Sequence, residues 1–358
     1  MDLKSPSQIV GALAIGALLI AACGSDDVSP ASTDAAVDES TQDAEVDATA
    51  DAGVVTVYTG RHYGIEPVFD EFTAATGIEV RFTTGNDPEL RERLVAEGAN
   101  TPADVVMTAD ASNIELAAAA GLLAPLTSDV LTSTIPEELR SASGEWFTLS
   151  ERARVIISST ERVDDPPTTY AGVGDPAWDG RICLRPSTHP YTQSLVASLV
   201  MAEGEERATE IVQSWVDNEP LYINSDTDIY KAVADGECDI AIANTYYLGR
   251  LLTEDPTFPV QIVWPEQDGR GAHVNVSTAA VTANAPNPEN GQALIEWLAT
   301  DGQAQFANVN FEYPADPAVA PDPIVAAWGE FKADLAAVRD LGANQPTAVE
   351  ILDTTGYE

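Results

Sequence analysis

The stretch VVTVYTGRHYGIEPVFDEFTAATGIEVRFT, residues 54–83, sets the fold. It begins with the β-branched and aromatic run VVTVYT, which favours a strand that ends before Gly60. Apolar side chains then recur at i, i+3, i+4 and i+7 from Ile65, which predicts an amphipathic helix that closes before Gly77. The run IEVRFT follows as a second strand. The stretch therefore predicts a strand, a helix and a strand in succession.

The same alternation continues along the chain. Further strands are expected at ADVVMT, RVIIS, ICLRP, LYIN, CDIAIANT and VQIVW, with helices at PELRERLVAEG, SLVASLVMAE and DIYKAVADG. Alternation of this kind predicts an α/β fold with mostly parallel sheets. Towards the C-terminal end, apolar residues from Trp328 to Val338 share one helical face, so a helix is expected within residues 323–341.

Length and charge narrow the classes of function. The chain has 358 residues, of which 44% are hydrophobic and 21% charged, and this predicts about two domains with substantial cores. The 58 acidic residues outnumber the 17 Lys and Arg and give a net charge of -41. A field of that sign repels phosphate backbones and anionic headgroups. Nucleic-acid binding and membrane binding through a basic face are therefore excluded.

The first 53 residues are interpreted as targeting segments. Residues 1–22 are expected to be a lipoprotein signal peptide, because the twelve-residue apolar run from Ile9 to Ile20 is too short to span a bilayer. The sequence IAACG around Cys23 resembles a lipobox, whose cysteine becomes lipid-modified. Residues 24–53 hold nine acidic and no basic residues, so residues 23–53 should form a disordered tether. We expect an extracytoplasmic protein that meets the membrane only through lipidated Cys23, in a periplasm or on the outer face of the cell membrane.

Cys183 and Cys238 remain if Cys23 is lipidated. Each stands at the start of an expected strand, so they would meet if those strands are neighbours in one sheet. An even pair in an oxidising compartment is a candidate disulfide. Two buried free thiols are the alternative.

Unusual side chains follow the ends of three expected strands, where ligands bind in open α/β sheets. They are Arg61, His62, Tyr63, Tyr191, Tyr246 and Tyr247.

The adjacent pair Tyr246 and Tyr247 allows a geometric test. On a strand the two side chains would point to opposite faces, whereas in a first helical turn they diverge by about 100° and can border one cleft. Phenols suit a hard, highly charged cation, which stabilises their anionic form, and this points to Fe(III). Zinc and copper sites require clusters of His and Cys, and the chain has only three histidines. Aromatic packing is the simpler interpretation from spacing alone.

From residue 54 to residue 316 the sequence resembles the periplasmic ferric-ion-binding proteins of bacterial ABC iron importers. The resemblance is carried, in order, by VYTGRHY, TPADVVMTAD, AAAAGLLAPL, RARVIIS, WDGRICLRPS, PYTQSLVAS, ANTYYLG, HVNVSTAAV and NFEYPADP. It implies a two-lobed periplasmic-binding-protein fold with hinge-crossing strands and a ligand cleft between the lobes.

The resemblance also implies a set of ligands. Tyr246 and Tyr247 match the adjacent tyrosines that bind iron in that family. His62, Tyr63 and Tyr191 match its tyrosine-rich subgroup. Some members use a glutamate after the TPADV strand, where this chain has Ala109, and a small-residue loop for a synergistic anion, where it has Tyr191. We therefore expect Tyr191 to occupy the place of the anion.

Arginines are expected to balance the charge of several phenolates around Fe(III). The candidates are Arg61, Arg152 and Arg154, either beside the ligands or as a clamp for carbonate, since guanidinium suits planar oxyanions. Salt bridges elsewhere are the alternative for these residues.

The combined expectation is a solute-binding protein with two lobes. Residues 54–151 and 273–312 should form lobe 1, and residues 152–272 and 313–358 lobe 2. The protein should be a monomer that captures Fe(III) and delivers it to ABC permease subunits. The alternative is the same fold with another cargo, namely an organophosphonate, thiamine, a polyamine or a ferric chelate. No nucleophile elbow or HExxH motif is present, so no enzyme activity is expected.

Overall fold

The computed structural model describes residues 53–61, 64–335, 338 and 341–358, and its central feature is a mixed β-sheet. Strand β1 (Val54–Thr59) pairs in parallel with β2 (Glu79–Thr84) and with β3 (Val105–Thr108). Strand β9 (Val274–Val281) runs antiparallel to β3. Strands β3 and β9 are buried along their whole length, and β9 also buries the polar side chains of Asn275, Ser277 and Thr278.

Strand β4 (Phe147–Ser159) connects two groups of strands. It pairs with β9 as far as Ala153 and with β7 (Ile240–Asn244) from Arg154 onward, both antiparallel. Strands β8 (Val260–Val263) and β10 (Tyr313–Pro314) also pair antiparallel with β4. One 13-residue strand therefore carries side chains of both groups.

Beyond β7 the sheet continues with parallel strands. Strand β5 (Ile182–Leu184) lies between β7 and β6 (Leu221–Tyr222). The full order is β2-β1-β3-β9-β4-β7-β5-β6. The expectation of mostly parallel sheets is wrong, because five of the nine strand pairings among the described residues are antiparallel. All five involve β4 or β9, the two long strands that pair in the middle of the order.

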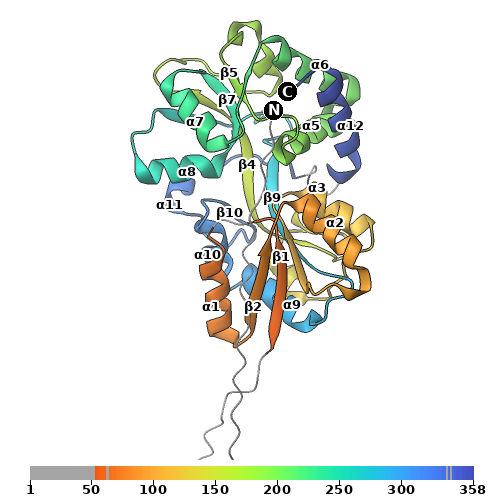
Figure 1. The fold of residues 1–358 in the computed structure, drawn as a ribbon. Coiled ribbons are helices and arrows are strands. Elements are labelled where there is room, and N and C mark those ends of the chain that lie inside the picture. Colours follow the sequence, from red (N-terminus) through yellow and green to blue (C-terminus); the bar gives the residue numbers. More distant parts are fainter. Residues whose placement is uncertain (1–52, 62–63, 336–337, 339–340) are drawn as a thin grey trace, which may run out of the picture. The chain divides into compact units, whose positions relative to one another are not determined.

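Helices cover the faces of the sheet (Figure 1). Up to residue 203 they are α1 (Glu66–Thr76), α2 (Asp87–Glu97), α3 (Ala111–Ala119), α4 (Asp129–Thr134) and α5 (Pro190–Glu203). The later helices are α6 (Glu205–Asp217), α7 (Asp226–Asp235), α8 (Thr245–Glu254), α9 (Pro288–Ala299), α10 (Gln303–Asn308), α11 (Pro323–Ala326) and α12 (Leu341–Thr354). No helix of the described residues has the length and apolar character needed to cross a membrane.

The helix expected within residues 323–341 is much shorter than the apolar pattern predicts, because only α11 forms and residues 329–334 are not helical. Helix α11 ends at Ala326, and Gly329 takes a left-handed φ of 79° that breaks the helical path. The chain then runs beside Ala272, whose N–H donates to Lys332 O at 2.8 Å and whose carbonyl accepts from Asp334 N at 2.8 Å. The long C-terminal helix is instead α12, which packs on α5 and α3.

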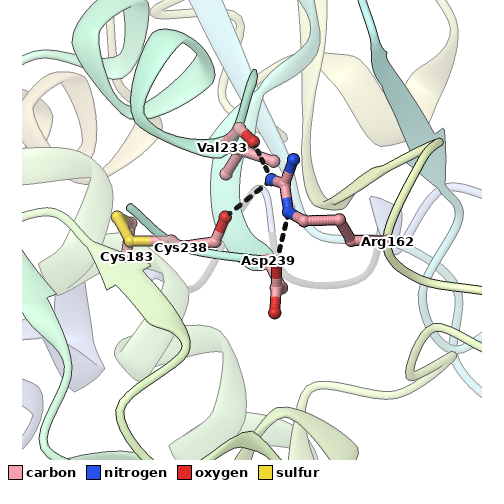
Figure 2. Close-up of a disulfide and its surroundings, with 5 residues drawn as sticks. All are labelled: Arg162, Cys183, Val233, Cys238 and Asp239. Carbon is pink, nitrogen blue, oxygen red and sulfur yellow. Dashed lines mark hydrogen bonds and ion pairs between the residues drawn. A yellow bond between two sulfur atoms is a disulfide. The ribbon is translucent and has the colours of Figure 1, made fainter. Parts of the chain in front are cut away.

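A disulfide joins Cys183 of β5 to Cys238, just before β7, with the Cα atoms 5.8 Å apart (Figure 2). The neighbouring Arg162 donates to Asp239 Oδ1 at 2.7 Å and to the carbonyls of Val233 and Cys238, as Figure 2 shows. Strands β5 and β7 pair directly, which brings the two cysteines together as their places in the sequence suggested.

Candidate metal centre

Tyr246 and Tyr247 occupy the first turn of α8, directly after β7. Asn244 ends the strand in extended conformation, and Thr245 begins the helix. The two rings stack with centroids 4.0 Å apart, and their exposed fractions are 2% and 9%. The adjacent tyrosines therefore stand at a strand-to-helix turn, as the geometric test required.

Tyr191 is the second residue of α5 and reaches the same region from another strand end. Its backbone N–H donates to His189 Nδ1 at 3.1 Å, so His189 caps this helix. Burial and the nearby Arg185 lower the pKa of His189 to about 3. The imidazole is therefore neutral at physiological pH, and its Nδ1 is already engaged in the helix cap.

A small cavity of about 30 Å³ brings the tyrosines and arginines together. It is lined by Gly60, Arg61, Ala109, Arg152, Tyr191, Tyr246, Ser277, Asn310 and Glu312. A volume of this size holds an ion or a water molecule but no organic ligand. The cavity is thus lined by Tyr191, Tyr246, Arg61 and Arg152, which the sequence singles out separately.

Arg152 is a buried cation beside the tyrosines. Its guanidinium carbon lies 5.4 Å from the centroid of the Tyr191 ring, and its Nη1 donates to Ser277 Oγ at 3.0 Å. Its Nη2 donates to the carbonyl of Ala109. Burial alone would lower the pKa of Arg152, but Tyr191, Glu312 and Tyr246 together raise it above its ordinary value. Arg152 is therefore a permanent positive charge beside the phenols.

The proton of the Tyr246 phenol is held tightly in the absence of a cation. Burial raises the pKa of Tyr246 well above its ordinary value, and Tyr191 and Tyr247 add to the rise, whereas Arg152 opposes it. A cation in the cavity would reverse this balance, because it stabilises the phenolate form.

Arg61 is fixed by a buried ion pair. Its Nη1 lies 2.7 Å from Glu312 Oε2 and donates to Ser150 Oγ at 2.8 Å, and its guanidinium carbon lies 3.8 Å from the centroid of the Phe306 ring. Arg154 pairs with Asp226 at 2.7 Å and lies 5.9 Å from the Tyr191 ring. Arg61 and Arg154 therefore have carboxylate partners, whereas the polar contacts of Arg152 are with a hydroxyl and a carbonyl.

A larger pocket of about 600 Å³ shares Gly60, Ala109 and Tyr191 with the small cavity. Its lining includes the carboxylates of Asp87 and Asp110. Burial and the neighbouring Asp110 raise the pKa of Asp87 to about 7. A Cβ atom at Gly60 would lie 1.6 Å from Asp87 Oδ1, so the close approach of these two residues requires glycine.

Three residues of the expected site lie outside the described residues, namely His62, Tyr63 and Cys23. Among the residues that the structure describes, no three His, Cys, Asp or Glu side chains gather as a metal site would require.

The bacterial extracellular solute-binding protein family model matches residues 68–333, which is most of the chain. The chain belongs to this family. The expected two-lobed α/β fold and the resemblance to ferric-ion-binding proteins are confirmed by the relatives below.

Iron uptake protein A1 of Synechocystis sp. is 38% identical over 356 residues, which cover 96% of this chain and 94% of that protein. Among solved structures, the IdiA (FutA) protein of Trichodesmium in complex with iron and citrate is 38% identical, with a TM-score of 0.80 and coverage of 86% and 100%. The apo ferric-ion-binding protein A of Pasteurella haemolytica is 32% identical, with a TM-score of 0.79 and coverage of 85% and 98%. These relatives are solute-binding proteins, so the expectation that this protein is not an enzyme is confirmed.

Glu312, Asn310 and Asp87 of this solute-binding protein were not predicted from the sequence, although the structure places them beside the cavity and the pocket. Asn310 and Glu312 fall within NFEYPADP, a stretch that carries the resemblance but contains no metal-ligand pattern of its own. Asp87 lies at the start of α2, where a carboxylate is ordinary. No local signal distinguishes these three residues, because only the tertiary structure places them beside the cavity and the pocket.

Proposed function

We propose that this solute-binding protein captures Fe(III) with tyrosine side chains and delivers it to the permease subunits of an ABC transporter. The observation that carries the proposal is the small cavity in which Tyr191 and Tyr246 meet, with Tyr247 stacked on Tyr246 and Arg152 alongside. Relatives with iron uptake and ferric binding in their names support the choice of cargo.

The chemistry of the donors favours the ferric ion over other cations. Phenol oxygens bind hard, highly charged cations, and a trication offsets the large rise that burial imposes on the pKa of Tyr246. In the proposed site Tyr191, Tyr246 and Tyr247 bind iron together with His62 and Tyr63, which the resemblance assigns.

Arginines complete the proposed charge balance. Four phenolates around Fe(III) leave one net negative charge, and Arg152 is the buried cation available to offset it. Arg61 and Arg154 support the same region through their contacts with Glu312 and Asp226. If a synergistic anion takes part, carbonate is the candidate, held by guanidinium groups.

The proposed capture uses the two lobes assigned from the sequence, residues 54–151 with 273–312 and residues 152–272 with 313–358. Strand β4 changes pairing partner between Ala153 and Arg154, close to the proposed boundary at residues 151 and 152. Closure about this strand would bring His62 and Tyr63, which follow β1, to the tyrosines of α5 and α8.

We also propose that Cys23 is lipidated and that residues 23–53 tether the monomeric body to the membrane. A Cys23→Ser variant should then leave the membrane fraction, whereas the wild type should incorporate labelled palmitate. Equal membrane association of the two proteins would refute the lipid anchor and would leave the proposal of iron binding unaffected.

The deciding experiment is a visible absorption titration of the soluble body, residues 54–358, with ferric citrate. We expect a phenolate-to-iron charge-transfer band that saturates near one equivalent. A Tyr246→Phe, Tyr247→Phe double variant should lose the band. Tyr58→Phe is the matched control, because the Tyr58 hydroxyl is bound to Glu97 and does not line the cavity. Absence of colour in the wild type would overturn the proposal.

A ferric chelate is a second candidate cargo. The pocket of about 600 Å³ beside the small cavity has room for an organic chelator. Native mass spectrometry of the iron-loaded protein distinguishes the two cargoes, since a retained citrate adds its mass to that of iron.

A further inference from the structure

Strand β4 carries Arg152 on the face towards the tyrosines and Glu151 on the opposite face. Successive side chains of a strand point to opposite sides, so Glu151 projects away from the candidate metal centre. Glu151 lies opposite Tyr313 in the antiparallel pairing of β4 with β10. Cross-strand partners share one face, which places Glu151 and Tyr313 together behind β4.

A third cavity, of about 500 Å³, lies on this side and is lined by Tyr313, Pro321, Ala326, Gly329, Glu330 and Phe331. Two of these lining residues, Tyr313 and Phe331, carry aromatic rings. The centroids of Tyr313 and Phe331 are 5.2 Å apart in an edge-to-face contact, and Phe331 stacks on Trp264 with centroids 4.1 Å apart. The stack fixes the orientation of the Phe331 ring.

Negative charge on this side has no cationic partner among the described residues. No ion pair joins Glu151 or Glu330 to any residue of 53–61, 64–335, 338 or 341–358. Burial raises the pKa of Glu151 to about 7, and no neighbouring cation lowers it. Burial and the charge of Glu151 also raise the pKa of Tyr313, whose buried hydroxyl has no hydrogen-bond partner among the described residues.

We propose that the cavity behind β4 binds a small organic cation of the quaternary ammonium class, at a site separate from the candidate metal centre. An alkylated ammonium group interacts favourably with the faces of aromatic rings and needs no hydrogen-bond acceptor for its methyl groups. Glu330 lines the cavity and Glu151 lies beside the lining residue Tyr313, so both carboxylates attract a cation there, and the volume lies in the range of small-molecule pockets. Anionic ligands are disfavoured by the same carboxylates.

The test is isothermal titration calorimetry of the full mature protein with choline at about 0.15 M salt, where exposed charges are largely screened. The control ligand is 3,3-dimethyl-1-butanol, which has the shape of choline and no charge. We expect choline to bind saturably with one-to-one stoichiometry and the neutral alcohol at least tenfold more weakly. Equal binding of the two ligands, or no binding of choline at millimolar concentration, would overturn the proposal.

Variants locate the site and separate it from iron capture. Phe331→Ala and Glu151→Gln should each weaken choline binding at least tenfold and leave a titration with ferric citrate unchanged. The Tyr246→Phe, Tyr247→Phe double variant should bind choline as the wild type does, whatever its effect on iron. Unchanged choline binding in both Phe331→Ala and Glu151→Gln would mean that choline binds elsewhere, which refutes the assignment even if iron capture is upheld.

Discussion

At the scale of single residues, Arg152 sets the electrostatics of the candidate metal centre. Burial dominates the raised pKa of Tyr246, and Arg152 is the cation that opposes it. In an Arg152→Gln variant we expect the iron charge-transfer colour to develop at a pH higher by about one unit or more, the shift that a nearby opposite charge produces. Absorbance titrations against pH measure the onset. In Arg152→Lys the colour should develop at a pH between those of the wild type and Arg152→Gln. If the colour developed at the same pH in the wild type and Arg152→Gln, this role of Arg152 would be contradicted.

His273 makes stability depend on pH. Burial, followed by Arg270 and Arg154, lowers its pKa from 6.5 to about 3. The unfolded chain therefore binds a proton at this residue before the folded protein does, and stability falls as the pH drops from 6.5 towards 3. One such group changes the free energy of unfolding by at most about 1.4 kcal/mol per pH unit. Urea unfolding at pH 7, 5 and 4 should show a shallower decline for His273→Asn, and parallel declines would rule out this contribution.

At the scale of elements, the packing of α8 decides where the tyrosine pair lies. Gly249 of α8 faces Phe311, and a Cβ atom there would lie 2.5 Å from Phe311 Cγ. We expect Gly249→Ala to displace α8 and to lower the free energy of unfolding by about 1–3 kcal/mol, the usual cost of overpacking. Iron affinity should fall as well, because Tyr246 and Tyr247 belong to the same helix.

Gly269→Ala is the control for this change. The nearest atom to a Cβ at Gly269 is the carbonyl oxygen of Glu266 at 3.6 Å, an ordinary contact distance. Denaturant unfolding and the ferric citrate titration should both distinguish the two alanine variants. Equal free energies of unfolding and equal iron affinities in the two variants would show that α8 can shift without losing stability or binding.

The disulfide contributes at the same scale by joining β5 to the start of β7. Its cysteines are 55 residues apart in the sequence, and closing a loop of that length stabilises a folded protein by about 4 kcal/mol in the chain-entropy treatment. We expect a Cys183→Ala, Cys238→Ala double variant to lose stability of that order in urea unfolding, and the wild type to lose a similar amount under reducing agent. Indistinguishable midpoints would show that the sheet alone holds the two strands.

At the scale of the whole molecule, the proposed function predicts that iron is released in acid. Each phenol must lose its proton to bind the ion, so protons compete with Fe(III) for the site. The affinity should therefore decline steadily as the pH falls below neutral. Equilibrium competition with citrate at several pH values measures it. An affinity that stays constant from neutral pH to about pH 4 is incompatible with ligation by tyrosines.

The local pattern of residues was sufficient to locate most helices and strands and to place Tyr246 and Tyr247 near a strand-to-helix turn. The period of apolar residues located α1, and the β-branched runs located β1 and β3. It failed for the stretch after α11, where Phe331 stacks on Trp264 instead of facing the sheet from a helix. The cause is backbone pairing with Ala272, a residue distant in the sequence, which periodicity does not report.

The amino-acid sequence by itself determined the α/β class, the family, and which donor atoms the proposed site on Tyr191, Tyr246 and Tyr247 would offer, because these depend on local periodicity, ordered motifs and the nature of the side chains. The tertiary structure alone decided that Arg61 pairs with Glu312, that Arg152 stands beside Tyr191, and that Glu151 faces Tyr313 behind β4. These pairs are far apart along the chain. Their contacts arise from the antiparallel course of the strands that pair with β4 and from the packing of α5, which no local pattern of residues encodes.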